Sequence, residues 1–537
     1  MVYTNHTTKI AIFSFGYNSR MRRYLFIGVF TAGLATMAVE LSASRLLGNY
    51  FGTSNLVWAA IIGLILIYLS VGYTLGGKWA DRSPEHATFF SILLWAGFFI
   101  GLIPIISRPI LRFASQAFDQ LQSASMIGAF AAVLILFSIP ITLLGTASPF
   151  AVRLAIKDEK AAGSVAGKIY TVSTFGSFIG TFLPVLVLIP LIGTYHTFII
   201  ISLFVLAIGL IGLGILGEKK FLLIYCLMPL LVIILALVGF RGYDKQADGI
   251  VYEGESVYNY IQVQNINEYH LLRLNEGQGI HSIAHPSQVN FFGPWEQVLS
   301  AAFFNPAPVF PANIDRIAIL GLAAGTSANQ INYAFPQTII DGYEIDPEIV
   351  TAGIQFFGLS ENHVNIFIED ARWGITHNHN VYDVVSIDAY TPPYIPWHMT
   401  TREFFTTVAN RLTGDGVMVI NVARIFEDRE LLNTLYATID SVFENTYIVD
   451  LPGTLNSMIF ATKAPTHPDN LVANYIHLST QDDTPPLLLS TIETTFLNLQ
   501  PTPTSGIILT DDKAPIEWIT NAMLVNLLFS EDLQKLQ

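Results

Sequence analysis

The stretch Ile317-Ala318-Ile319-Leu320-Gly321-Leu322-Ala323-Ala324-Gly325-Thr326 decides the fold of the C-terminal half of this chain. An apolar run stops there at small residues, and the next apolar run ends at Glu344, nineteen residues after Gly325. Small residues let a backbone approach a nucleoside, and an acid after the second strand accepts hydrogen bonds from ribose hydroxyls. The pattern predicts the first crossover of a Rossmann-like fold, with Gly321, Gly325 and Glu344 beside a bound nucleoside.

Predicted strands and helices alternate around this stretch. Such alternation builds a doubly wound, mostly parallel sheet that binds its ligand at the carboxyl ends of the strands. Short alternating segments over 251–282, with a turn at 275–277, predict a small antiparallel sheet before it. We expect strands at 316–321, 338–344, 364–368, 382–388, 416–422, 444–449 and 457–462. We expect helices at 293–304, 326–334, 346–357, 400–412 and 427–441.

Acidic residues follow several of the predicted strands. Glu344, Asp370 and Asp388 each come after a strand, and Asp511 and Asp512 lie near the end of the chain. A single acid in such a place is often a helix cap or a solvated loop residue. Three consecutive strands that each end in an acid favour a ligand-binding or catalytic site at the strand ends.

Asp388 stands out because the aromatic and proline-rich segment 390–397 follows it. This segment either only covers the sheet or forms an apolar wall beside the carboxylate. An apolar wall raises the pKa of a carboxyl group and suits it to act as a general base.

The N-terminal half consists of long apolar stretches. Across the whole chain 52% of the residues are hydrophobic and only 13% are charged. Several charge-free stretches are long enough to cross roughly 30 Å of hydrocarbon, and 169–217 is long enough for two crossings, with a break near 190–193. We therefore expect an α-helical transmembrane bundle of about seven helices, at 22–47, 55–77, 87–107, 126–150, 165–190, 195–216 and 221–239.

Basic residues between these helices favour one orientation. They gather in the N-terminal segment and in the second, fourth and sixth loops, whereas the first and third loops carry only Arg45, Arg108 and Arg112. By the positive-inside rule the N-terminus is cytoplasmic, and seven crossings then place the C-terminal half outside. A nucleoside cofactor is cytoplasmic, so the side that holds this half stays open. The protein is expected to be a multi-pass integral membrane protein whose partner is the lipid bilayer.

Composition divides the chain into a transmembrane helical domain at 1–240, a small β subdomain at 250–292 and a Rossmann-like domain at 293–537. The first 240 residues carry a net charge of +8 and the remainder a net charge of −22. The acidic part repels nucleic acid and attracts cations such as polyamines, although such charge also serves solubility. The single cysteine, Cys226, lies in an apolar span, which excludes disulfides and thiolate metal sites, and no metal is expected.

Over roughly 250–465 the chain resembles the spermidine synthase (polyamine aminopropyltransferase) family, with an echo at 509–518. The resemblance implies a class I methyltransferase-like fold, and the helical half is similar to that of membrane-fused members. The motifs that carry it are Glu255–Val263, Leu274–Ser282, Gly321–Gly325, Gly342–Asp346, Glu369–Arg372 and Ile387–Tyr390.

The resemblance implies a role for each matched residue. Glu344 would hold the ribose of decarboxylated S-adenosylmethionine, and Asp370, with Ala371 beside it, would hold the adenine amine. Asp388 would deprotonate the attacking amine in an in-line displacement at the sulfonium carbon, which needs no metal. Asn259 stands where soluble members have glutamine, and it is expected to bind substrate together with Tyr258 and Tyr390.

The sequence departs from the family pattern at three places. Active members carry an acid where Ala324 stands and usually a second acid where Thr391 stands, and Trp295-Glu296 replaces a common Tyr-Glu or His-Glu pair. Without those acids a bound diamine loses partners for its ammonium groups.

Three functions therefore stay open. The chain is an aminopropyltransferase-like enzyme that acts on a small-molecule amine, or an S-adenosylmethionine-dependent transferase with another acceptor, such as a lipid. Alternatively it is a non-catalytic module, as a homo-oligomer or as a subunit of a membrane complex.

Overall fold

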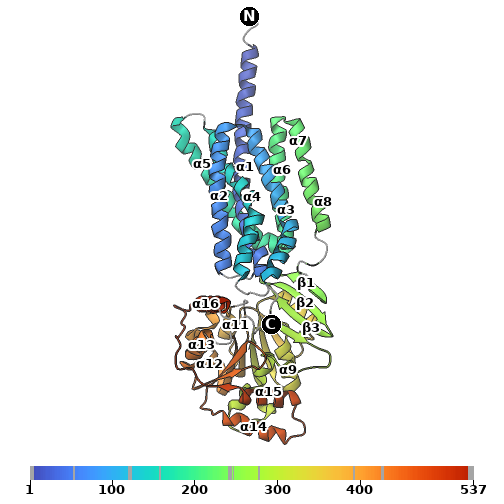
Figure 1. The fold of residues 1–537 in the computed structure, drawn as a ribbon, viewed down its shortest axis with the longest axis vertical. Helices are drawn as coiled ribbons and strands as arrows, with labels where there is room; N and C mark the ends of the chain where they lie inside the picture. Colours follow the sequence, from blue (N-terminus) through green and yellow to red (C-terminus); the bar gives the residue numbers. More distant parts are fainter. Residues whose placement is uncertain are drawn as a thin grey trace. The chain divides into compact units, whose positions relative to one another are not determined.

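The protein was analysed as a computed structural model (Figure 1) that describes residues 5–51, 55–118, 124–156, 159–239, 243, 245, 247–275, 279–390, 394–424 and 428–529. The chain forms two compact units, of which the first ends at Gln246 and the second begins at Ala247. The first unit is helical and the second is an α/β domain that carries a small antiparallel sheet. This arrangement confirms the predicted fold class.

The described part of the first unit contains six helical segments that are long and apolar enough to span a membrane. The fifth, Ala162–Leu216, is a single helical run of 55 residues that bends at Gly193, where φ is +77°, inside the predicted break. Its two arms correspond to the two helices that were predicted at 165–190 and 195–216. The helices are α1 (Asn5–Phe51), α2 (Asn55–Arg82), α3 (His86–Phe118), α4 (Ala124–Ala155), α5 (Ala162–Leu183), α6 (Ile189–Leu216), α7 (Lys219–Tyr225) and α8 (Leu227–Gly239).

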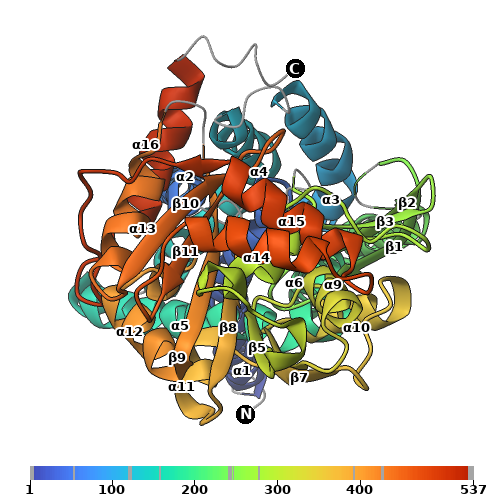
Figure 2. The same ribbon diagram turned by 90° about the horizontal axis from the view of Figure 1, so that it is seen from below.

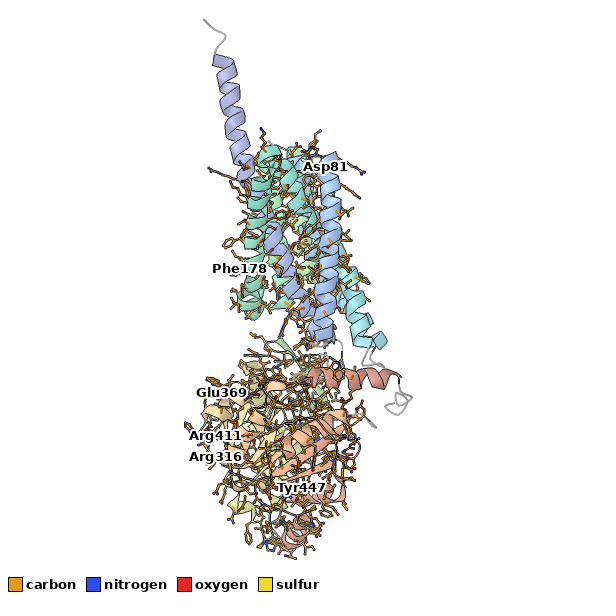
Figure 3. The ribbon with its side chains drawn as sticks, turned by 90° about the vertical axis from the view of Figure 1, so that its left-hand side faces the viewer. Asp81, Phe178, Arg316, Glu369, Arg411 and Tyr447 are labelled. Carbon is orange, nitrogen blue, oxygen red and sulfur yellow. The ribbon has the colours of Figure 1, made fainter. Side chains whose placement is uncertain are left out.

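Contacts between the helices show that successive passes run in opposite directions. Gly28 near the start of the first span faces Phe89 near the start of α3, so these two helices run in parallel. Phe150, near the end of α4, lies 6.3 Å from Phe89 between ring centroids, so α4 runs the other way. The end of α2 joins this same end of the bundle through an ion pair of 3.1 Å between Asp81 and Arg153 (Figure 3).

The last two passes continue the alternation. Tyr195, at the start of α6, has its hydroxyl 3.5 Å from that of Tyr50 at the end of α1. Farther along α6, a Cβ at Gly212 would meet the ring of Phe90, and Val232 of α8 lies beside Gly101 of α3. The bundle therefore begins its first pass at one end and completes its last pass at the other.

Small residues bring α5 against α1. A Cβ at Gly176 or Gly180 would lie 2.2 or 2.1 Å from the carbonyl oxygens of Phe30 and Leu34, so only glycine permits this contact. On the opposite face of α5, Phe178 points away from the bundle (Figure 3). Gly163 and Gly167, near the start of α5, make no such approach, because a Cβ at either would have no described atom within 4 Å.

The second unit starts with a four-stranded antiparallel sheet in the order β1-β2-β3-β4. Its strands are β1 (Ile250–Glu255), β2 (Tyr260–Ile266), β3 (Tyr269–Leu274) and β4 (Ser282–Ala284). Of the turn predicted at 275–277, only Asn275 is among the described residues. Where a helix over 293–304 was expected, the structure has the 3-10 helix η3 (Trp295–Phe304).

The main sheet has eight strands in the order β12-β10-β11-β9-β8-β5-β6-β7. The pairs from β9 to β7 are parallel, and those from β9 to β12 are antiparallel. The chain order reverses between β8, β5 and β6, where open α/β sheets bind ligands. The strands are β5 (Arg316–Leu320), β6 (Ile339–Glu344), β7 (Val364–Ile368), β8 (Tyr382–Ile387), β9 (Leu412–Ala423), β10 (Asn445–Asp450), β11 (Asn456–Thr462) and β12 (Leu499–Gln500).

Helices cover both faces of this sheet through two separate apolar cores. One core packs α11 (Ala371–His377), α12 (Arg402–Arg411), α13 (Glu430–Asp440) and α16 (Ile516–Phe529). The other packs η3, α9 (Thr326–Ala334), α10 (Pro347–Phe356), α14 (Asp469–Ser479) and α15 (Pro486–Leu497), the last two side by side (Figure 2). Helix α11 is too short to show a helical period, which is why the sequence did not predict it.

Candidate active site

One cavity of about 250 Å³ lies at the carboxyl ends of β5, β6, β7 and β8. Its volume is close to the lower end of the range for small-molecule sites. The residues predicted for the site line it, except Gly325 and the pair Asp511 and Asp512 near the end of the chain. The lining residues are Tyr258, Asn259, Leu274, His281, Gly321, Ala323, Tyr343, Glu344, Ile345, Ile349, Asp370, Ala371, Asp388, Ala389, Tyr390, Pro396, His398 and Met399.

The glycine loop lets two strand ends approach each other. Gly321 has φ +100°, and a Cβ there would lie 2.4 Å from the carbonyl oxygen of Asp388, so only glycine fits. Gly325 has φ +92° and precedes α9, where a Cβ would meet Leu359 rather than the cavity. Gly325 thus shapes the loop, while Ala323 takes the place on the cavity wall.

Glu344 is held by two backbone amides. Its Oε2 accepts a hydrogen bond from the Ala323 N–H (2.9 Å) and its Oε1 accepts one from the Asp346 N–H (3.0 Å). Burial raises its pKa to about 7, while the two backbone amides oppose this shift. Each oxygen keeps lone pairs that can accept further hydrogen bonds from hydroxyl groups in the cavity.

Asp370 caps helix α11 and contacts a histidine that the sequence did not single out. Its Oδ1 accepts a hydrogen bond from the Trp373 N–H (2.8 Å), and its Oδ2 lies 3.1 Å from Nε2 of His398. The hydrogen bond from His398 lowers the pKa of Asp370. Because 28 residues separate the two side chains, no local motif could have predicted the pair.

Asp388 has one side-chain partner among the described residues. Nδ2 of Asn421, on β9, donates a hydrogen bond of 3.0 Å to Oδ1 of Asp388. Burial raises the pKa of Asp388 to about 6, and the hydrogen bond from Asn421 lowers it. A carboxyl group with a pKa near 6 is ionised at neutral pH and can still accept a proton.

Tyr390 contributes a ring to the wall rather than a hydroxyl group. Its hydroxyl donates to the carbonyl of Asn421 (3.0 Å) and accepts from the N–H of Ala423 (2.9 Å). Burial, and then the charge of Asp388, raise its pKa above its ordinary value. Of the predicted wall at 390–397, Tyr390 and Pro396 thus line the cavity together with Asp388, and the Tyr390 hydroxyl is hydrogen-bonded to the backbone of β9.

Asn259 belongs to a network of side chains on the small sheet. Its Nδ2 donates to Oδ2 of Asp346 (2.9 Å), and its Oδ1 accepts from Nδ2 of Asn275 (2.9 Å). Asp346 also accepts from the Ser256 hydroxyl (2.6 Å) and caps α10 through the Glu348 N–H (3.1 Å). Asn259 is therefore held by the protein at the cavity edge, next to the exposed Tyr258.

The positions at which the sequence departs from the family pattern lie in different surroundings. Ala324 is fully buried against Ile261 and Ala352, so it does not face the cavity. Glu296 accepts hydrogen bonds from the Phe291 and Gly293 N–H groups (2.5 and 3.0 Å) and does not line the cavity. Thr391 lies outside the described residues.

Asp511 was expected at the ligand edge of the sheet, and this expectation is wrong. Its carboxylate forms a bidentate pair with Arg372 at 2.8 and 2.6 Å, and neither it nor Asp512 lines the cavity. His281 does line it, which its place in the hairpin motif did not reveal. Burial, and then the charge of Arg273, lower the pKa of His281 to about 4.

A metal centre is not evident in the described ranges, since they contain no group of three or more His, Cys, Asp or Glu side chains placed to hold an ion.

Comparison with known proteins shows what the domain is similar to. Residues 313–474 match the family model of the spermine/spermidine synthase domain. A probable polyamine aminopropyl transferase of Bifidobacterium longum is 30% identical over 298 residues, which cover 52% of this chain and 64% of that protein. The match therefore spans less than two thirds of this relative. The resemblance to the spermidine synthase family is confirmed.

Two further similarities extend the comparison. Polyamine aminopropyltransferase 2 of Aquifex aeolicus is 22% identical over 424 residues, covering 76% of this chain and 81% of that protein. The crystal structure of a probable spermidine synthase from Corynebacterium glutamicum is 19% identical, with a TM-score of 0.39, and the match covers 50% of this chain and 97% of that one.

Proposed function

We propose that this protein is a membrane-anchored aminopropyltransferase-like enzyme that transfers the aminopropyl group of decarboxylated S-adenosylmethionine to an amine. The observation that carries the proposal is the convergence of Glu344, Asp370 and Asp388, from the ends of three strands, on one cavity. The three carboxylates have different partners, and burial raises the pKa values of Glu344 and Asp388 whereas the hydrogen bond from His398 lowers that of Asp370. Such separation suits carboxylates that have separate tasks.

The first two carboxylates would bind the adenosyl group. Glu344 lies at the end of the strand next to the glycine loop, with lone pairs available for both ribose hydroxyls. Asp370 lies one strand farther along and would accept a hydrogen bond from the adenine amine, with His398 holding its second oxygen. Gly321 and Ala323 would let the backbone approach the nucleoside.

Asp388 would act on the acceptor. The amine nitrogen attacks the aminopropyl carbon bonded to sulfur, a C–N bond forms, and the C–S bond breaks with its electron pair moving to sulfur. The products are the neutral thioether methylthioadenosine and an alkylated ammonium, whose proton passes to Asp388. Positioning of the two reactants and removal of the proton account for the catalysis.

Release of methylthioadenosine tests this function. The purified full chain, supplied with decarboxylated S-adenosylmethionine and a panel of amines, should release methylthioadenosine, and the Asp388→Asn variant should not. If the protein binds methylthioadenosine but releases none with any amine, the enzymatic proposal fails and a non-catalytic module is left.

Transfer of another group is the second candidate, and the replacement of a substrate-binding acid by the buried Ala324 favours it. In this case the protein would bind S-adenosylmethionine more tightly than its decarboxylated form. Calorimetric titration of both donors distinguishes the candidates, because the carboxylate of S-adenosylmethionine requires a cationic or amide partner that the aminopropyl group does not.

A further inference from the structure

A second cavity in the α/β unit is separate from the candidate active site. Its volume is about 110 Å³, and none of its lining residues lines the first cavity. A buried water needs roughly 10–15 Å³ of such volume, so there is room for several waters or for one short organic molecule. The cavity lies between the start of η3, the middle of α15 and the turn after β10, and it is lined by Asn290, Phe292, Gly293, Glu296, Gln297, Leu451, Pro452, Ser490, Thr491 and Thr494.

Glu296 gives this cavity a buried carboxylate. It is 2% exposed, and its described hydrogen-bond partners are all donors. Its Oε1 accepts from the Phe291 N–H and from Nε2 of Gln330, at 2.5 and 3.0 Å, and its Oε2 accepts from the Gly293 N–H at 3.0 Å. Donors on both oxygens favour the ionised form, although burial raises the pKa of Glu296. A carboxylate accepts about four hydrogen bonds, so Glu296 can accept a further one.

This carboxylate has no cationic partner in the part of the chain that the structure describes. Among those residues no lysine, arginine or histidine forms an ion pair with Glu296. A buried charge is unfavourable unless a charge of opposite sign lies beside it. A cation from solution can supply that charge, and the cavity next to Glu296 has room for it.

Two hydroxyl groups of α15 face the cavity as hydrogen-bond acceptors. The hydroxyls of Thr491 and Thr494 donate to the carbonyl oxygens of Leu487 and Ser490, each at 2.8 Å. Their single hydrogens are therefore in use, and their oxygens can only accept. A ligand that bonds to these oxygens and to Glu296 has to supply the hydrogens itself.

An aromatic ring lies at the exposed side of the cavity. Phe292 is 76% exposed and has φ +55°, a backbone conformation that bulky residues rarely adopt. Its N–H donates to Oδ1 of Asn290 (3.1 Å), and Nδ2 of Asn290 donates to the Ser490 hydroxyl oxygen (3.2 Å). Asn290 thus holds Phe292 in a strained conformation beside the cavity, and such strain is concentrated at ligand-binding sites. The face of an aromatic ring attracts an ammonium group.

We infer that this second cavity binds the primary ammonium group of a short alkylamine. The ammonium donates hydrogen bonds to Glu296 and to the hydroxyl oxygens of Thr491 and Thr494, while Phe292 and Leu451 contact the alkyl chain. A monoamine and one end of a polyamine present the same group. The inference does not rest on the proposed function, because the two cavities share no lining residue.

Equilibrium dialysis with labelled propylamine tests the inference. The full chain is used as its Asp388→Asn variant, so that amine bound at Asp388 does not contribute. We expect about one propylamine per chain, with a Kd on the order of 1 mM or tighter. Absence of binding at about 10 mM propylamine would overturn the site.

Competition identifies the chemistry of the ligand. Tetramethylammonium has no N–H to donate, and the ammonium ion has no alkyl chain, so each should compete at least about fivefold more weakly than propylamine. Equal competition by either of them, or by K⁺, would overturn the assignment to an alkylammonium. Putrescine that competes as well as propylamine assigns the site to one end of a polyamine, and weaker competition assigns it to a monoamine.

Variants of the lining residues locate the bound amine. Glu296→Gln should weaken propylamine binding more than about tenfold, because the amide keeps the shape but not the charge. Thr494→Val leaves every partner of Glu296 in place and should weaken binding about tenfold, which covers the case that Glu296→Gln does not fold.

Thr406→Val is the matched control for the threonine variant. Thr406 is exposed on α12, donates to the carbonyl four residues back at 2.8 Å as Thr494 does, and lines neither cavity. It should bind propylamine like its parent. Unchanged binding in both Glu296→Gln and Thr494→Val would overturn the site.

Discussion

Nδ2 of Asn421 donates a 3.0 Å hydrogen bond to Oδ1 of Asp388, between the carboxyl ends of the parallel strands β9 and β8. Ile387 is in register with Ile420, so the two side chains are the next residues along their strands. Asn421 is 7% exposed, and its backbone carbonyl accepts the bond from Tyr390. One residue of β9 thus positions both the candidate base and the wall beside it.

Asp388→Asn should abolish activity and stabilise the fold. The asparagine oxygen can keep the bond from Asn421 but cannot accept a proton, so turnover should fall by about 10²–10⁴-fold. Methylthioadenosine release and thermal unfolding measure the two effects. Asp512→Asn is the matched control, because Asp512 is exposed and outside the cavity.

The stability effect follows from the sign of the pKa shift. The pKa of Asp388, about 6, lies above its ordinary value of 3.8, so the native state holds this proton more tightly than the unfolded state. Its destabilisation grows as the pH rises from about 4 and is complete above about 6. At pH 8 the pKa shift corresponds to about 3 kcal/mol, so the asparagine variant should gain up to that amount, and an equal loss would contradict this assignment.

Activity should depend on pH through the same carboxylate. The base must be ionised, so kcat/KM should fall as the pH drops through about 6. Asn421→Leu removes the hydrogen bond that lowers the pKa of Asp388, so the acid limb of the profile should move to higher pH. A profile of Asn421→Leu that overlays the native one would show that another group controls the limb.

His398→Ala should weaken donor binding. The hydrogen bond from His398 lowers the pKa of Asp370 and holds its Oδ2, so the loss of His398 leaves that carboxylate less well oriented. Asp370 stays ionised at neutral pH without this bond, so we expect methylthioadenosine to bind about tenfold more weakly because the carboxylate loses its orientation. The exposed His363 provides the control variant His363→Ala, and an equal loss in both variants would argue against this pairing.

Ala324→Asp should unfold the protein instead of restoring a diamine site. Ala324 is fully buried in the cluster between β2 and α10, so a carboxylate there lacks solvent and a partner. We expect a loss of about 3 kcal/mol or more in the free energy of unfolding, measured with urea. Ala323→Asp is the comparison, since Ala323 lines the cavity and aspartate tolerates its φ of +48°. Native-like stability of Ala324→Asp would contradict the packing described here.

The two ends of the chain should lie on opposite sides of the membrane. Passes alternate in direction, and basic residues such as Arg23, Lys78 and Arg153 gather at the end where the first pass begins. A C-terminal alkaline phosphatase fusion should therefore be active and a C-terminal fluorescent fusion dark. A cytoplasmic C-terminus would mean that the bundle inserts against its charge bias. In the expected topology, donor added outside intact cells should reach the cavity.

Sequence patterns alone determined the class of each half. Segment length and lack of charge predict spans, because a helix must cover a fixed thickness of hydrocarbon. The glycine loop before α9 and the acid after β6 predict the nucleoside crossover, because the backbone must approach the ligand there. These patterns are local, so they can be read without knowing which distant residues meet.

Only the tertiary structure decided which side chains share the cavity. His398 meets Asp370 and Asn421 meets Asp388 across 28 and 33 residues, and both contacts depend on how strands align in the sheet. The same packing buries Ala324 in the core and pairs Asp511 with Arg372. The sequence pattern had placed both Ala324 and Asp511 near the ligand. The spacing of residues along the sequence predicts which residue types lie at the strand ends. The direction and burial of their side chains depend on the register between strands and on the helices packed against the sheet.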